Sequence, residues 1–285
     1  MAALVIGVNY RTDDHAVRFA RSLEKYSALE VKVILVDNSE REDSSVFFRR
    51  IGEANASIKC LQTPRNLGYF GGANFGWAQY LIDSPPPDWV IVCNVDVEFN
   101  DGQFFSALRE LERIESLGVV APRIWSARWK RDLNPKISQR PSKAKMNLYR
   151  VIFGNYYLQM TYEILSFAKN GLKALIRDTF ASFRGHPRIE TQIEEAPSIY
   201  APHGSCIIFN RRYFSAGGDF EYSVFLFGEE IFVAETAKRV GLTVRYCPWL
   251  RILDSEHAST GIIRSRRVAG YMKDATTYLV EHYFA

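Results

Sequence analysis

Short apolar runs alternate with amphipathic stretches along the first 125 residues of the chain. Apolar runs rich in β-branched residues predict buried strands over 2–8, 31–36, 57–61 and 89–97. The stretches between them have the spacing of helices over 15–26, 44–54 and 73–82. This alternating order predicts an α/β fold, with a mostly parallel central sheet and helices on both faces.

Beyond residue 125 the pattern is looser and richer in helix. A polar, basic loop is expected over 126–142, an aromatic-rich and mostly helical stretch over 147–183, and strands over 199–210 and 242–246. Helices are expected over 103–116, 211–216, 229–240 and 264–284, and one more strand over 117–124. We therefore divide the chain at 1–125, 126–195, 196–263 and 264–285, the second part being a helical, basic insertion.

The strand that starts at Trp89 ends in Asn94-Val95-Asp96. In open α/β sheets, ligands bind outside the carboxyl ends of the strands. A carboxylate at such an end, with an oxygen-bearing side chain two positions away on the same side of the pleat, suits a hard divalent cation. Such a cation would neutralise a pyrophosphate, and this indicates an enzyme that uses a nucleotide-linked substrate.

Polar residues also follow each of the first three predicted strands. Asn9-Tyr10-Arg11 and Asp37-Asn38 could hydrogen-bond a base and a ribose, or could simply form turns and helix caps. A glycine-rich segment follows the third strand, with a candidate phosphate-binding arginine, two asparagines and glycines that permit close backbone approach. Its candidate ligand-binding residues are Arg65, Asn66, Gly68, Gly72 and Asn74. The segment matches neither a dinucleotide fingerprint nor a Walker loop, and the alternative is a tight loop that packs a helix on the sheet.

Composition and charge narrow the class of protein. The chain is 47% hydrophobic and 24% charged, as in ordinary globular proteins. Its four cysteines have no CxxC spacing, which argues against a zinc site and fits a reducing, cytoplasmic compartment. No apolar run approaches the length of a membrane span. The net charge is only +4, so a general affinity for nucleic acid is not expected.

Most of the positive charge is concentrated in one stretch. Residues 136–190 contain ten Lys or Arg and three Asp or Glu, a local excess of seven. If 164–183 is one helix, Lys169, Lys173, Arg177 and Arg184 fall along one stripe beside a broad apolar side. Such a helix could lie on an anionic membrane surface at the inner face of the cell membrane, or could pack on the domain with its lysines merely solvated.

The ordered set of motifs resembles family 2 glycosyltransferases of the GT-A fold, especially bacterial rhamnosyltransferase-like members. In the N-terminal half the resemblance rests on Asn9-Tyr10, Val36-Asp37-Asn38, Asn66-Leu67-Gly68 through Asn74-x-Gly76, and Asn94-Val95-Asp96. Downstream it rests on His203-Gly204-Ser205, Gly217-Gly218-Asp219-Phe220, Phe227-Gly228-Glu229-Glu230, and His257 followed by Ser259. It spans residues 3 to about 260, except for the poorly matched 126–195.

The resemblance implies roles for these residues. Donor-binding roles fall to Asn9, Tyr10, Arg11, Asp37, Asn38, Arg65, Asn66, Gly68, Gly72, Asn74, Asn94 and Val95. Asp96 and His257 become the candidate ligands of Mg²⁺ or Mn²⁺, with Glu98 in reserve, and His203, Gly204 and Ser205 lie on the acceptor side. Glu230 becomes the base that accepts the acceptor's proton, with Glu229 orienting the acceptor. The family usually has Asp at position 230, so the role could pass to Glu229, and a helix dipole alone would also favour two acidic residues there.

The expected activity is therefore an inverting, metal-dependent glycosyl transfer. The expected donor is a UDP- or dTDP-sugar, with dTDP-rhamnose suggested by the family. The expected acceptor is a glycan or a polyprenyl-diphosphate-linked glycan of the cell surface. A non-catalytic sugar-nucleotide or glycan binder and a sugar nucleotidyltransferase are the alternatives. The nucleotidyltransferase would need a basic loop near the first strand, where this chain has only Arg11. The oligomeric state is left open.

Overall fold

The structure is a computed structural model, and it describes residues 1–166, 196–255 and 265–285. These residues form two compact units. Unit 1 comprises 1–140 and 196–255, and unit 2 comprises 141–166 and 265–285. Within the described segments, no helix has both the length and the apolar character that crossing a bilayer would require.

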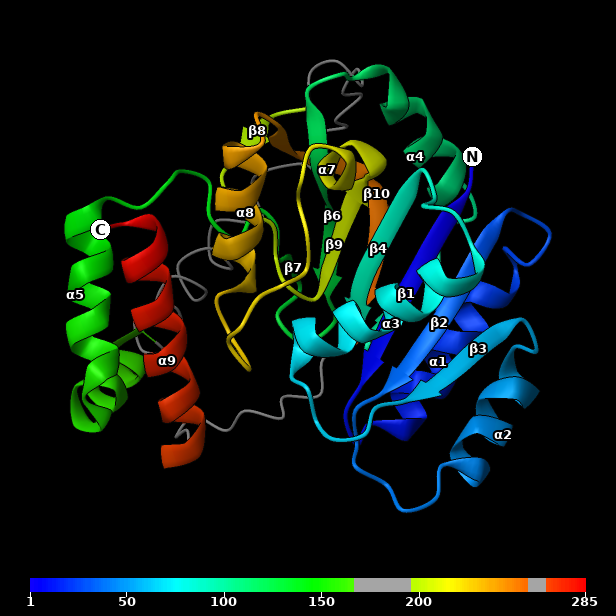
Figure 1. Cartoon of the computed structure of the whole chain (residues 1–285), viewed down its shortest axis with the longest axis horizontal. Helices are drawn as coiled ribbons and strands as arrows, with labels where there is room; N and C mark the ends of the chain where they lie inside the picture. The colour runs from blue at the N-terminus through cyan, green and yellow to red at the C-terminus, as the bar shows by residue number, and fades with distance from the viewer. Residues whose placement is uncertain (167–195, 256–264) are drawn as a thin grey trace. The chain divides into compact units, whose positions relative to one another are not determined.

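The first 94 residues form the alternating order that the hydrophobic pattern predicted (Figure 1). The elements are β1 (Ala3–Asn9), α1 (Asp13–Glu24), β2 (Val31–Asp37), α2 (Ser45–Ala54), β3 (Ile58–Gln62), α3 (Tyr69–Asp83) and β4 (Trp89–Asn94). Some boundaries were predicted wrongly. Helix α3 begins at Tyr69 and not at Ala73, α1 lies two residues earlier than expected, and a turn at 95–96 interrupts the expected strand over 89–97. Helix α3 packs closely at Gly72, where an added Cβ would lie only 3.0 Å from Val8 and 3.1 Å from Asn38. A glycine therefore suits this position inside the helix.

The rest of unit 1 adds strands to this sheet and further helices. Its elements are β5 (Val97–Glu98), α4 (Phe104–Glu110), a 3₁₀ turn (Leu111–Arg113), β6 (Leu117–Ser126), β7 (Arg131–Asp132), β8 (Ser198–Ile199), β9 (Cys206–Asn210), α7 (Arg211–Ser215), α8 (Glu229–Arg239) and β10 (Thr243–Asp254). The expected loop over 126–142 contains β7, the expected strand over 199–210 is two strands, and β10 is longer than the expected 242–246.

The strands lie in the order β3-β2-β1-β4-β9-β6-β10-β5, with β7 on β6 and β8 on β10. The first four are mutually parallel, β9 is antiparallel to both β4 and β6, and β10 is parallel to β6. In the described chain, six of the eight strands along this path therefore point the same way. The prediction of a mostly parallel sheet is confirmed.

Alternate residues of the strands are buried on opposite faces of the sheet, and a helix layer covers each face (Figure 1). On one face Val5 and Leu35 share a core with Phe19 of α1 and Phe105 of α4. On the other face Gly76 of α3 comes so close that a Cβ would lie 2.9 Å from Val36 and 3.0 Å from Ile6. Strands buried on both faces read as continuous apolar runs, which explains the sequence pattern.

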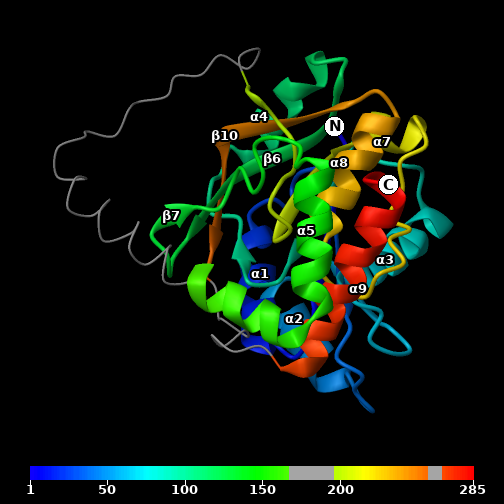
Figure 2. The same ribbon diagram turned by 90° about the vertical axis from the view of Figure 1, so that its left-hand side faces the viewer.

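Unit 2 contains α5 (Lys143–Gly154), helical backbone over 156–166, and α9 (Arg266–Tyr283). Helices α5 and α9 lie side by side (Figure 2). The helix expected over 147–183 starts earlier, at Lys143, and is interrupted at Asn155. There Asn155 ends α5 and its side chain accepts hydrogen bonds from the backbone N–H groups of Tyr157 and Leu158, as an N-cap does. The basic stripe from Lys169 to Arg184 lies outside the described residues.

Candidate active site

The topology brings the predicted site residues to one edge of the sheet. Strands β1, β2 and β4 are parallel, so their carboxyl ends at Asn9, Asp37 and Asn94 meet at this edge. Strand β9 runs the other way and pairs Cys206 with Cys93, so it begins where β4 ends. The residues before β9, 203–205, therefore reach the same edge, and the backbone N–H of Asn94 donates to the carbonyl oxygen of Ser205 at 3.0 Å.

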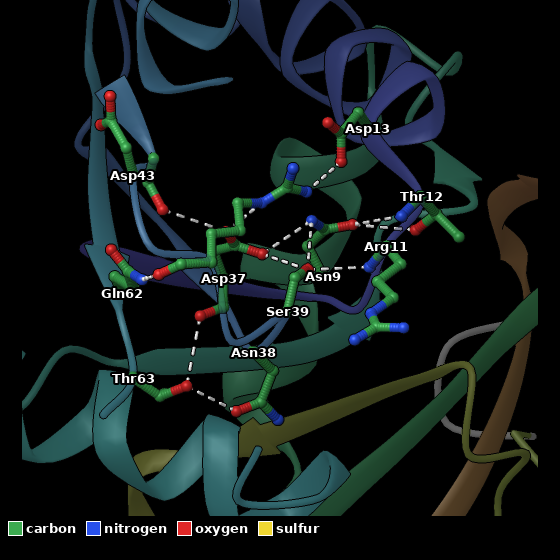
Figure 3. Close-up of polar contacts among 12 residues, drawn as sticks. Asn9, Arg11, Thr12, Asp13, Asp37, Asn38, Ser39, Asp43, Gln62 and Thr63 are labelled. Carbon is green, nitrogen blue, oxygen red and sulfur yellow. Dashed lines mark hydrogen bonds and ion pairs between the residues drawn. The ribbon is translucent and has the colours of Figure 1, made fainter. Parts of the chain in front are cut away.

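Asn9 and Asp37 form the centre of a buried hydrogen-bond network (Figure 3). Both side chains are fully buried, and the Asn9 amide nitrogen donates to Asp37 Oδ1 at 3.0 Å. Asn9 Oδ1 accepts from the hydroxyl and the backbone N–H of Thr12, and Asp37 Oδ2 accepts from Arg41 Nε at 2.7 Å. These bonds fix the loops after β1 and β2. The part of either side chain in donor binding stays a prediction.

Beside this network lies a cleft of about 780 Å³. Its walls include Arg11, Ser39, Arg41 and the start of α1. Arg11 is exposed, has a left-handed backbone with φ 57°, and its backbone N–H donates to Ser39 Oγ at 2.8 Å. Its guanidinium lies 5.3 Å from the centre of the exposed Tyr10 ring. Tyr10 and Arg11 therefore present a ring and a positive charge to solvent at this edge.

Asn38 holds the loop between β3 and α3 in place. Its amide nitrogen donates to the carbonyl oxygen of Gly68 at 2.7 Å, and its Oδ1 accepts from the backbone N–H of Leu67 at 3.1 Å. Asn66 Oδ1 accepts from the backbone N–H of Gly68 at 3.0 Å. Gly68 has φ +77°, and a Cβ on it would lie 1.9 Å from the carbonyl oxygen of Phe225. The glycine thus allows this loop to touch the segment that precedes α8.

The other predicted residues of this loop differ in exposure. Arg65 is exposed, Asn74 is half-buried on α3, and Gly72 faces Asn38 inside α3. Asn66 is half-buried as well, so solvent reaches Arg65, Asn66 and Asn74.

Asp96 lies in the turn between β4 and β5 and is half-buried. Its backbone carbonyl accepts from both the N–H and the hydroxyl of Ser255, at 3.0 and 2.8 Å. Ser255 follows β10, whose Asp254 pairs with Val97 of β5. The end of β10 therefore fixes the turn that carries Asp96, while the adjacent Val95 is buried and contributes to packing.

Asp96 is the predicted metal ligand that the structure describes at this edge. Within the described ranges no three His, Cys, Asp or Glu side chains cluster to hold a metal, and His257 lies outside them. Glu98 forms an ion pair with Arg18 at 3.7 Å. Mg²⁺ commonly takes one or two protein carboxylates and completes its shell with water and substrate phosphates. Asp96 fits that pattern as a single protein ligand.

Two glutamates at the start of α8 face Gly204. A Cβ built on Gly204 would lie 3.2 Å from Oε1 of Glu230 and 3.4 Å from Oε1 of Glu229. Gly228, with φ 86°, turns the chain into this helix. Glu229 is buried, and this burial, together with the charge of Glu230, raises the pKa of its carboxyl to about 8. Folding therefore favours the protonated form of Glu229.

Tyr69 connects the glycine-rich segment to this glutamate pair. Its buried hydroxyl donates to the carbonyl oxygen of Gly204 at 2.7 Å. Burial raises the pKa of Tyr69 well above its usual value, and the charges of Glu229 and Asp96 add to the rise, so both carboxyls lie in its surroundings. Tyr69 was not among the predicted site residues, although an aromatic residue inside a glycine-rich segment was a usable signal.

His203 is held by its neighbours as a neutral ring. Its Nδ1 is hydrogen-bonded to Ser205 Oγ at 2.9 Å and accepts from the backbone N–H of Ser205. Burial and the positive charges of Lys136 and Arg131 lower the pKa of His203 to about 3. The positive charges of the loop over 126–142 therefore act on His203, although the basic excess from residue 136 did not indicate which residue they would affect.

Contacts with α3 and with Arg140 fix the position of α8. Phe232 of α8 lies edge-on to Phe70 of α3, with ring centres 6.2 Å apart. The buried Glu235 accepts from Arg140 through both carboxylate oxygens, at 2.7 and 3.2 Å. These contacts hold the first turn of α8 against 203–205.

Comparison with protein families decides the class of this protein. Residues 8–218 match the family model described as Glycosyl transferase family 2. The chain belongs to glycosyl transferase family 2. The family resemblance expected from the motifs is confirmed, and so is the prediction that the protein is a glycosyltransferase.

A curated relative is similar to this chain over nearly its whole length. The chain is 25% identical, over 98% of its length and 84% of the relative's, to the N-acetylglucosaminyl-diphospho-decaprenol L-rhamnosyltransferase of Mycobacterium tuberculosis. The expected likeness to rhamnosyltransferases is thereby confirmed as a likeness.

Solved structures confirm the expected GT-A architecture of the glycosyltransferase. The mannosyltransferase PcManGT of Pyrobaculum calidifontis, in complex with GDP-Man and Mn²⁺, superposes with a TM-score of 0.53 at 11% identity, over 99% of this chain and 69% of that one. GalNAc-T7 with UDP, GalNAc and Mn²⁺ gives 0.57 at 13% identity, over 90% and 44%. At these identities the likeness is one of fold.

Proposed function

We propose that this glycosyltransferase moves a sugar from a nucleotide-sugar donor to a polyprenyl-diphosphate-linked glycan, with inversion at the anomeric carbon. The observation that carries the proposal is the placement of Glu229 and Glu230 against Gly204, at the sheet edge that also carries Asp96. One end of the site then offers a ligand for the donor's diphosphate, and the other offers a proton acceptor for the acceptor hydroxyl.

The donor side of the proposal places the diphosphate near Asp96. A bound Mg²⁺ or Mn²⁺ would offset the charge that develops on the leaving diphosphate. Arg11 and Arg65 are exposed cations on the loops of this edge that could meet the donor's phosphates, and Tyr10 could stack on its base. The Mn²⁺ ions named with PcManGT and GalNAc-T7 support the choice of cation. A dTDP- or UDP-sugar is the proposed donor, with dTDP-rhamnose favoured by the mycobacterial relative's name.

The acceptor side of the proposal assigns different roles to the two glutamates. The acceptor oxygen forms a bond to the anomeric carbon as the bond from that carbon to the diphosphate oxygen breaks on the opposite face. Glu230 accepts the hydroxyl proton. Burial and the charge of Glu230 favour the protonated form of Glu229, so its proposed role is to donate a hydrogen bond that orients Glu230 or the acceptor. His203 and Ser205 line the acceptor side as neutral hydrogen-bonding groups.

Product formation from candidate donors tests this proposal directly. The purified protein is incubated with Mn²⁺, dTDP-rhamnose or UDP-sugars, and a synthetic N-acetylglucosaminyl-diphospho-lipid, and the products are identified by mass spectrometry. Glu230→Gln should lower kcat by about a hundredfold or more while donor affinity persists. Glu221→Gln, on an exposed residue, is the matched control. Turnover that survives both Glu230→Gln and Glu229→Gln would exclude the assigned base.

Asp96 is tested separately by cation dependence. Asp96→Asn should weaken donor binding in the presence of Mn²⁺ and leave the weaker binding in EDTA unchanged, because only the cation-dependent part requires this carboxylate. Isothermal titration with dTDP or UDP measures both. Equal losses in Mn²⁺ and in EDTA would assign Asp96 a structural role only.

Unit 2 is proposed to face the lipid that carries the acceptor. Its described helices expose large apolar side chains, namely Leu148, Val151, Tyr157, Leu158, Ile164 and Leu165. With the basic excess of 136–190, these suit peripheral attachment to an anionic membrane surface. Co-sedimentation with anionic and neutral vesicles tests this. In this proposal 1–125 binds the nucleotide sugar, 126–195 meets the acceptor or membrane, 196–263 completes the catalytic half, and 264–285 is the terminal helix.

A further inference from the structure

A second pocket lies wholly within unit 2 and has no part in the transfer described above. Its volume is about 470 Å³, and it is walled by the end of α5, the helix that follows it, and the first half of α9. The residues that matter here are Phe153, Tyr156, Gln159, Arg266, Gly270 and Lys273. Two of them are cations, and none of the described residues that line the pocket is acidic.

Gln159 supplies the most specific chemical signal in this pocket. Its side chain is 1% exposed, and its amide nitrogen donates to Glu163 Oε1 at 3.1 Å. That bond fixes the orientation of the amide, because the opposite orientation would set two acceptor oxygens against each other. Gln159 Oε1 is buried and has no hydrogen-bond donor among the described residues. Such an acceptor is costly to leave unmet, and a ligand hydroxyl or N–H group would satisfy it.

The pocket is also suited to a negative charge. Arg266 and Lys273 are exposed, so their charges are available to a ligand, and the Arg266 guanidinium lies 5.5 Å from the centre of the Tyr156 ring. The pocket lies at the N-terminal ends of two helices, 156–166 and α9, whose dipoles both favour an anion.

Two further features of the pocket suit a ring-shaped ligand, namely aromatic side chains in its lining and open space beside two glycines. Phe153 and Tyr156 provide aromatic faces on which a sugar ring could pack. Gly270 of α9 and Gly154 at the end of α5 leave open space, because a Cβ built on either meets no atom of the described chain within 4 Å.

We infer that this pocket binds a phosphorylated sugar, with the phosphate near Arg266 and Lys273 and a sugar hydroxyl donating to Gln159 Oε1. The same chemistry occurs in a free sugar phosphate and in the headgroup of a sugar-bearing phospholipid. The inference rests on unit 2 alone and does not depend on the proposed transfer reaction.

Titration calorimetry of the full chain tests the inference with N-acetylglucosamine 1-phosphate. Binding is expected, and both inorganic phosphate and unphosphorylated N-acetylglucosamine should bind at least about tenfold more weakly. Gln159→Leu and Lys273→Ala should each raise the Kd by about tenfold or more. Lys143→Ala, on an exposed lysine at the start of α5, is the charge control and should leave the Kd unchanged.

Two more variants keep the test decisive if Gln159→Leu disturbs the fold. Gly270→Leu removes no bond, favours the helix, and fills the pocket, so it should abolish binding while raising thermal stability. Glu230→Gln should leave binding intact, since Glu230 belongs to unit 1. Loss of binding in Glu230→Gln but not in Gln159→Leu would place the ligand at the catalytic edge and overturn the inference. Inorganic phosphate binding as tightly as the sugar phosphate would also overturn it.

A vesicle arm distinguishes the two sources of the ligand. Neutral vesicles are compared with vesicles that contain phosphatidylinositol or, at equal charge, phosphatidylserine. Retention on phosphatidylinositol alone, lost in Gln159→Leu and Gly270→Leu, assigns the pocket to a lipid headgroup. Binding of the soluble sugar phosphate without such retention assigns it to a free metabolite of the same chemistry.

Discussion

The hydroxyl of Tyr69 donates a hydrogen bond of 2.7 Å to the carbonyl oxygen of Gly204. The two residues are 135 positions apart, and both are buried. One stands at the start of α3, on the donor side of the site, and the other faces the carboxyl groups of Glu229 and Glu230. This bond sets the position of residues 203–205, here called the acceptor segment, relative to the glycine-rich segment.

Tyr69→Phe should therefore impair both stability and activity. The substitution leaves the Gly204 carbonyl without its donor, at a cost of about 1–3 kcal/mol in the free energy of unfolding. A shift of the acceptor segment should also lower kcat/KM by about tenfold or more. Tyr26→Phe is the matched control, because Tyr26 is likewise buried and donates to a backbone carbonyl, that of Asp101, in the loop before α4. Urea unfolding and turnover should show a stability loss in both variants and an activity loss only in Tyr69→Phe; equal activity in the two would contradict the positioning role.

Glu229→Gln should change how stability depends on pH. The pKa of this carboxyl rises from 4.5 to about 8 on folding, first through burial and then through the charge of Glu230. Between these values the folded protein holds a proton that the unfolded chain has lost, so this group's contribution is complete below about pH 4.5 and falls as the pH rises towards 8. The amide of the variant does not titrate. Relative to the wild type, its free energy of unfolding should rise by on the order of a few kcal/mol between acid and mildly alkaline conditions.

Urea midpoints of both proteins, measured from about pH 5 to about pH 9, check this prediction. A constant difference between the two proteins across the range would show that Glu229 does not titrate there.

Asp37→Asn should destabilise unit 1 by about 3 kcal/mol or more. Asp37 is fully buried and accepts from Asn9, Ser39 and Arg41. Removing its charge leaves the Arg41 guanidinium next to a neutral amide in a buried network. Glu42→Gln, on the exposed neighbour of Arg41, should stay within about 0.5 kcal/mol of the wild type. Thermal unfolding of both variants measures the difference, and similar melting temperatures for the two would refute the central role of Asp37.

Gly68→Ala should cost more than about 3 kcal/mol and abolish donor binding. The backbone has φ +77°, and the added methyl group would overlap the carbonyl oxygen of Phe225, so the loop cannot keep its course. Gly52→Ala is the opposite case, because Gly52 lies in α2 and its Cβ would meet no described atom within 4 Å. That control should raise stability by about 0.5–1 kcal/mol. Circular dichroism melts and dTDP or UDP titrations compare the two, and a Gly68→Ala protein with normal nucleotide affinity would exclude the tight loop.

The sequence predicted the N-terminal half of the fold well because its elements are short and strongly periodic. It misplaced the start of α3, since four glycines and an aromatic pair between Gly68 and Gly76 resemble a loop, whereas packing against Val8 and Ile6 makes them helical. It also ended β10 too early. The register of β10 against β6 shifts between Cys247 and Arg251, where Pro248 interrupts the ladder, and the strand then resumes.

The site was predictable in its location but not in its orientation. Parallel strand ends must share an edge, so Asn9, Asp37 and Asp96 had to lie near one another. Whether a polar side chain at such an end points to solvent or into the loops depends on contacts that no local pattern contains. Asn9 and Asp37 turn inward, and the contact of Gly68 with Phe225 joins segments that are distant in the chain. The glutamate pair was recognisable only through its family motif.

The antiparallel pairing of β9 with β4 fixes the distance between residues 203–205 and the end of β4. This distance can change only in steps of one residue of register. Sliding β9 by one residue would move Gly204 by about 3.3 Å and turn every β9 side chain to the other face. Evolution therefore cannot adjust this distance continuously by moving strands. The length of the side chain at position 230, the proposed base, is the finer adjustment that remains, and a glutamate there reaches one methylene further than an aspartate would.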